Sequence, residues 1–185
     1  MEQALVLISI VLGVAIAFEL ENLNRALRSK RVKWHWAQAL FAIFALLLVV
    51  SFWWAIASQD LDRSVSLGAF LPIMGVLILL VLISAVALPD ELPSDHVLDM
   101  GEYYQENRRY QWGLVAGFML IAFGYDSWWS FARLEPLEAA VQIAPNAVVP
   151  LLCLTMMVLE RWWKVAIGFA GLYLLPLFWL SRTLG

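Results

Sequence analysis

Glu19 and Asn22 lie three residues apart near the end of a long apolar run, so a helix places both side chains on one face. Polar groups at membrane depth are costly, because lipid offers them no hydrogen bonds, and they often carry function. The spacing therefore predicts a site for an ion or a proton. The alternative is a helix that emerges into the headgroups, where Glu21 can pair with Arg25 at i, i+4.

A second candidate site lies in the apolar segment around Asn146. Pro145 and Pro150 each remove a backbone hydrogen bond and should bend or open a helix there. Freed carbonyls beside Asn146 and Gln142 are the kind of polar pocket from which discontinuous membrane helices build ion and substrate sites. The alternative is a packing kink. Asp126, in the preceding apolar segment, is either a further site acid or an interfacial acid.

No residue pattern indicates an enzyme, a metal site or a cofactor. Cys153 is the single cysteine, which excludes an internal disulfide and a multi-cysteine metal site. His35 and His96 lack further ligands at metal-site spacing, and no nucleophile elbow, zinc-protease motif or phosphate loop is present. A net charge of -3 does not favour nucleic acid. We therefore expect no cofactor and no nucleic-acid partner.

The composition requires a bilayer around these candidate residues. Of the 185 residues, 63% are hydrophobic and only 15% are charged, whereas soluble domains carry about 25% charged residues. The mean hydropathy is +0.78. So many apolar residues cannot be covered by a polar surface, and the sequence predicts an all-α integral membrane protein.

Apolar segments near 20 residues, the length that spans a bilayer, predict a bundle of six transmembrane helices in one domain over 1–185. The expected spans are 3–22, 34–57, 66–88, 110–130, 136–159 and 163–181. The longest connection, 89–109, is expected to be a cytoplasmic loop, with Ser94 and Asp95 starting an interfacial helix. A plain solvated connector is the alternative.

The basic residues set the expected orientation. With six spans, nine of the 12 Lys and Arg residues fall on one side: Arg25, Arg28, Lys30, Arg31, Lys33, Arg108, Arg109, Arg161 and Lys164. The positive-inside rule makes that side cytoplasmic, which puts both termini in the periplasm or outside the cell. The tryptophans fall near the predicted span ends, as in the aromatic belts of bilayer proteins.

Spans one to three share scattered identities with spans four to six, among them Leu71-Pro72 with Leu175-Pro176. An odd number of spans per half would make this a 3+3 inverted repeat. Chance identity in a chain so rich in Leu, Ala and Val is the alternative. Gly113 and Gly117 form a GxxxG pattern, and Gly13 and Ala17 share that spacing, which predicts close helix packing.

Three aromatic-rich segments resemble a family of small bacterial multi-spanning inner-membrane proteins without an assigned function. The segments are Trp34-His35-Trp36, Phe52-Trp53-Trp54 and the stretch from Tyr103-Tyr104 to Arg108-Arg109-Tyr110-Gln111-Trp112. The resemblance covers about the first two-thirds of the chain. It implies a bacterial inner membrane and carries no information about a substrate.

Together these features favour a small transporter or channel for an ion or small solute, with the lipid bilayer as its surroundings. The candidate site residues are Glu19, Asn22, Asp126, Gln142 and Asn146. The alternative is an accessory or structural subunit of a larger membrane complex, or a homo-oligomer, docked through its small-residue faces.

Overall fold

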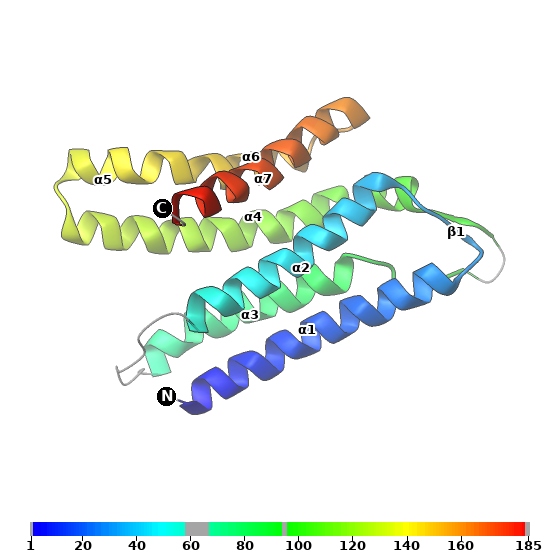
Figure 1. The fold of residues 1–185 in the computed structure, drawn as a ribbon, viewed down its shortest axis with the longest axis horizontal. Helices are drawn as coiled ribbons and strands as arrows, with labels where there is room; N and C mark the ends of the chain where they lie inside the picture. Colours follow the sequence, from blue (N-terminus) through cyan, green and yellow to red (C-terminus); the bar gives the residue numbers. More distant parts are fainter. Residues whose placement is uncertain (1, 58–66, 94–95, 184–185) are drawn as a thin grey trace. The chain divides into compact units, whose positions relative to one another are not determined.

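The computed structural model describes residues 2–57, 67–93 and 96–183, and helices dominate them (Figure 1). The helices are α1 (Glu2–Arg28), α2 (Trp36–Ala57), α3 (Leu67–Val86), α4 (Met100–Arg133), α5 (Pro136–Ile143), the 3-10 helix η1 (Ala144–Ala147), α6 (Val148–Met156) and α7 (Trp162–Thr183). Two short strands, β1 (Val32–Lys33) and β2 (Leu98–Asp99), join them. The predicted helical class is confirmed.

Three described helices are long and apolar enough to cross a membrane. They cover Leu5–Arg28, Trp36–Ala57 and Pro136–Met156, the last being α5, η1 and α6 in succession. α3 contributes a shorter apolar stretch, Leu71–Val86. α4 begins at Met100, whereas we expected a span from 110, so its first ten residues extend the helix with mostly polar side chains. The expected cap at Ser94 and Asp95 lies outside the described residues.

The chain divides into two compact units, Met1–Tyr104 (unit 1) and Gln105–Gly185 (unit 2). In unit 1, α1 packs against both α2 and α3, and α2 also contacts α3. Side chains such as Ile8, Leu12, Phe41, Leu77 and Leu80 form its core. Because α1 faces two helices, a residue on its inward face becomes inaccessible to solvent.

A short parallel ladder joins the two connectors of unit 1. Val32 pairs with Leu98 and Lys33 with Asp99, and the Leu98 N–H donates to the Arg31 carbonyl at 2.8 Å. The Lys33 Nζ also forms a 2.7 Å ion pair with Asp99 Oδ2. The other carboxylate oxygen of Asp99 accepts the Gly101 N–H at 2.8 Å, at the start of α4. The ladder thus fixes the chain between α1 and α2 to the start of α4.

This ladder is expected to weaken on acidification. Burial lowers the pKa of His35, with Asp99 opposing and Lys33 adding to the shift, and the hydrogen bond from Lys33 lowers the pKa of Asp99. Both depressed values mean that the folded state binds fewer protons than the unfolded chain. The His35 contribution is present above its ordinary pKa of 6.5 and is lost as pH falls from 6.5 towards the lower pKa of the folded state. The Asp99 contribution is lost in the same way below 3.8.

Thermal unfolding in detergent should therefore start at a lower temperature at pH 5.5 than at pH 7.5. In His35→Gln the difference between the two pH values should shrink, because the titrating group is gone. An unchanged difference would assign the pH dependence to other groups.

Two glycines of α7 allow close helix packing in unit 2. An added Cβ at Gly168 would overlap the Met156 sulfur, and one at Gly171 would lie 3.4 Å from Leu152 Cδ1. These small residues let α7 approach α6 closely. Of the glycines in the GxxxG pattern and its counterpart, Gly113 would place a Cβ 3.6 Å from Met157 Cε, whereas Cβ atoms at Gly13 and Gly117 would meet nothing within 4 Å in the described part of the chain.

The predicted interruption at the two prolines takes the form of one tight turn. Pro145 lies in the first turn of η1, where its missing N–H costs least, and the helix resumes as α6. Trp112 of α4 is fully buried, with its ring 5.5 Å from the Phe169 ring of α7. Its hydrophobic area thus holds α7 against α4.

Candidate functional site

Glu19 is a completely buried carboxylate in the apolar helix α1. Its exposed fraction is 0%, and within the described residues neither carboxylate oxygen has a hydrogen-bond partner. Ser84 of α3 lies near this carboxyl, but the two side chains do not form a hydrogen bond of normal geometry. Burial of an acid in this way costs desolvation free energy, and no hydrogen bond to the carboxyl offsets that cost.

Other polar side chains lie around the same end of unit 1. The Gln38 Nε2 of α2 donates to the Ala87 carbonyl at 2.5 Å, which satisfies a group left open by the end of α3. The Gln38 Oε1 and the Ser84 hydroxyl are buried without partners within the described chain. Ser84 and Ala87 are one helical turn apart, about 4.5 Å along the axis. Buried oxygens from three helices thus lie near one level of the bundle.

The connector after α3 closes this end of the unit. Asn22, 4% exposed, donates to Asp90 Oδ1 at 2.7 Å, and Arg25 donates to the Asp90 carbonyl. The Tyr103 hydroxyl donates to the Val86 carbonyl at 3.3 Å, and burial together with the charge of Asp90 raises its pKa to about 12. The hydroxyl therefore keeps its proton at neutral pH. Glu19 lies one helical turn before Asn22, further inside unit 1 than these polar contacts.

The arrangement suits the exchange of a single positive charge. A buried carboxylate without a partner can be neutralised by a proton or by a monovalent cation. Oxygen atoms are also the ligands that hard cations take. Among the described residues, no group of three or more His, Cys, Asp or Glu residues forms a site for a metal ion. One carboxylate balances one unit charge, which favours a proton or a monovalent cation over a divalent one.

The remaining predicted site residues, Asp126, Gln142 and Asn146, lie in unit 2, and two of them form a pair. Asn146 Nδ2 donates to Asp126 Oδ2 at 3.0 Å, which links η1 to α4. Both residues are exposed, as is Gln142. The mid-depth polar pocket expected around Asn146 is therefore not enclosed within this unit. The amide instead pairs with the nearest acid across the two helices.

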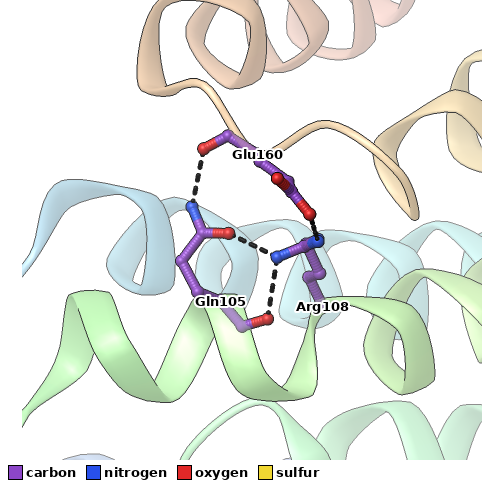
Figure 2. Close-up of polar contacts among 3 residues, drawn as sticks. All are labelled: Gln105, Arg108 and Glu160. Carbon is purple, nitrogen blue, oxygen red and sulfur yellow. Dashed lines mark hydrogen bonds and ion pairs between the residues drawn. The ribbon is translucent and has the colours of Figure 1, made fainter.

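A second buried charge, which the sequence analysis missed, lies at the other end of unit 2. Arg108 donates to Glu160 Oε1 at 2.6 Å and to Gln105 Oε1 at 2.6 Å, as Figure 2 shows. The side chain of Arg108 is 10% exposed, against 71% for Glu160. Gln105 also donates to the Glu160 carbonyl at 3.0 Å. The cluster ties the turn before α7 to α4, which indicates a structural role, although the buried Arg108 Nε has no hydrogen-bond partner within the described residues.

Sequence reasoning missed Gln38, Ser84 and Asp90 as neighbours of the predicted site. The available signal was the occurrence of Gln38 and Ser84 inside otherwise apolar helices. The Asn22–Asp90 contact joins residues 68 positions apart, so no local pattern marks it.

Comparison with protein-family models, curated proteins and solved structures finds no match to this chain.

Proposed function

We propose that the protein is a small membrane transporter or channel for a proton or a monovalent cation, with Glu19 as its ion-exchanging group. The observation that carries this proposal is the complete burial of the Glu19 carboxyl, without a partner, in a helix long enough to span a membrane. An acid of this kind is costly to keep, and exchange of a positive charge gives it a use.

The proposal includes an architecture of six membrane-crossing segments in a bacterial inner membrane, with both termini periplasmic. Supporting it, unit 1 contains α1 to α3, and unit 2 contains most of α4 together with α5 to α7. That boundary agrees with the division into two three-span halves. The segregated basic residues support the same topology.

Ion flux through the reconstituted protein tests the function. Purified protein in sealed vesicles would be given one gradient at a time, of protons, Na⁺ or K⁺, with Ca²⁺ as the divalent comparison. We expect the protein to dissipate at least one monovalent gradient faster than protein-free vesicles, and to leave the Ca²⁺ gradient intact. If no gradient decays faster, the transport proposal fails, and an accessory subunit of a membrane complex becomes the better account.

A further inference from the structure

An open groove lies at the end of α1, within about three turns after Glu19. Its volume is about 450 Å³, within the roughly 300–1,000 Å³ range of small-ligand sites. The groove is lined by Glu21, Asn24, Arg25, Arg28, Ser29 and Leu92. Because α1 from Leu5 to Arg28 is a candidate span, the groove lies where that helix reaches the lipid headgroups.

The charges in this groove leave one cation available. Arg25 forms a 2.9 Å ion pair with Glu21 and donates a hydrogen bond to the Asp90 carbonyl. The charges of Arg25 and Glu21 therefore largely cancel. In the described part of the chain, no hydrogen bond or ion pair engages Arg28, and its side chain is exposed. The lining therefore carries one net positive charge, with the Asn24 amide and the Ser29 hydroxyl beside it.

We propose that this groove binds the phosphate of an anionic phospholipid headgroup through Arg28. A guanidinium presents paired donors that match phosphate oxygens. Asn24 can donate a further hydrogen bond, and Leu92 provides an apolar wall for the glycerol end of the lipid. Basic pockets at the ends of membrane helices are known to hold anionic headgroups. The carbonyl end of α1 repels anions, so the guanidinium supplies the attraction and the binding is sensitive to salt.

The test is lipid binding to the whole protein, measured by native mass spectrometry in a neutral detergent. The probes are short-chain phosphatidylglycerol, short-chain phosphatidylcholine and inorganic phosphate. The variant is Arg28→Gln, and the matched control is Lys30→Gln, which removes the same charge two residues away, outside the groove lining. Unfolding temperatures without lipid show whether both variants remain folded.

We expect phosphatidylglycerol to bind more tightly than phosphatidylcholine, and Arg28→Gln to weaken it about 10-fold, the scale of one charge-assisted hydrogen bond. Lys30→Gln should stay close to wild type. Equal losses in both variants would show that binding follows total charge, and would overturn the site. Competition by inorganic phosphate at the same concentrations as the lipid would replace the lipid assignment with a soluble-anion site.

Discussion

Replacement of Glu19 by methionine is expected to make the protein more stable. The wild-type carboxyl is fully buried without a hydrogen-bond partner in the described residues, so its desolvation is uncompensated in either protonation state. Methionine has similar length, and its flexible thioether can fill the space between α1 and α3. Exchanging buried charged groups for apolar ones of similar volume is neutral or stabilising by about 1–4 kcal/mol.

The measurement is thermal or denaturant unfolding of the detergent-solubilised protein, with Glu21→Met as the matched control. Glu21 is exposed and paired with Arg25 at 2.9 Å, and such surface pairs contribute about 0–1 kcal/mol. That control should therefore be unchanged or slightly less stable. A clear loss of stability in Glu19→Met would identify Glu19 as a structural group whose partners lie in the folded bundle.

The packing of α6 on α7 predicts a second large effect, at Gly168. A valine there would place its Cβ against the sulfur of Met156, so this fully buried side chain would have to shift. Overpacking of this kind costs about 1–3 kcal/mol. Gly168→Val should lower the free energy of unfolding by that amount.

The double variant Gly168→Val with Met156→Ala should be less destabilised than the sum of the two single variants, because each change makes room for the other. Gly13→Val is the control, since an added Cβ at Gly13 meets no atom within 4 Å. Additive losses, or an equal loss at Gly13, would show that the contact between Gly168 and Met156 does not limit the packing.

α1 and α2 were predictable because each is a long apolar segment, and bilayer dimensions fix the length of such segments. The burial of Glu19 follows from the same reasoning, since the acid lies inside the helical part of the run. The position of close packing was not predictable. Gly113 and Gly117 have the GxxxG spacing, yet Gly168 makes the close contact, because what matters is which face of α7 meets Met156.

The polar contacts of the site depend on tertiary structure in the same way. Asp90 reaches Asn22, and Glu160 reaches Arg108, only because connectors fold back over helix ends. Conversely, the neighbouring prolines alone predicted a polar pocket at Asn146. One turn of 3-10 helix accommodates Pro145, however, and the amide bonds to Asp126 rather than lining an enclosed pocket.

Glu19 is the proposed exchanging group, and the flux of the reconstituted Glu19→Gln variant tests this role most directly. Glutamine keeps the size and polarity of the side chain but cannot release a proton or balance a cation. We predict that Glu19→Gln vesicles lose at least about 90% of the wild-type rate, which corresponds to roughly 1.4 kcal/mol of barrier. Glu21→Gln vesicles should retain that rate. A Glu19→Gln protein that is folded, correctly inserted and as fast as wild type would contradict the account.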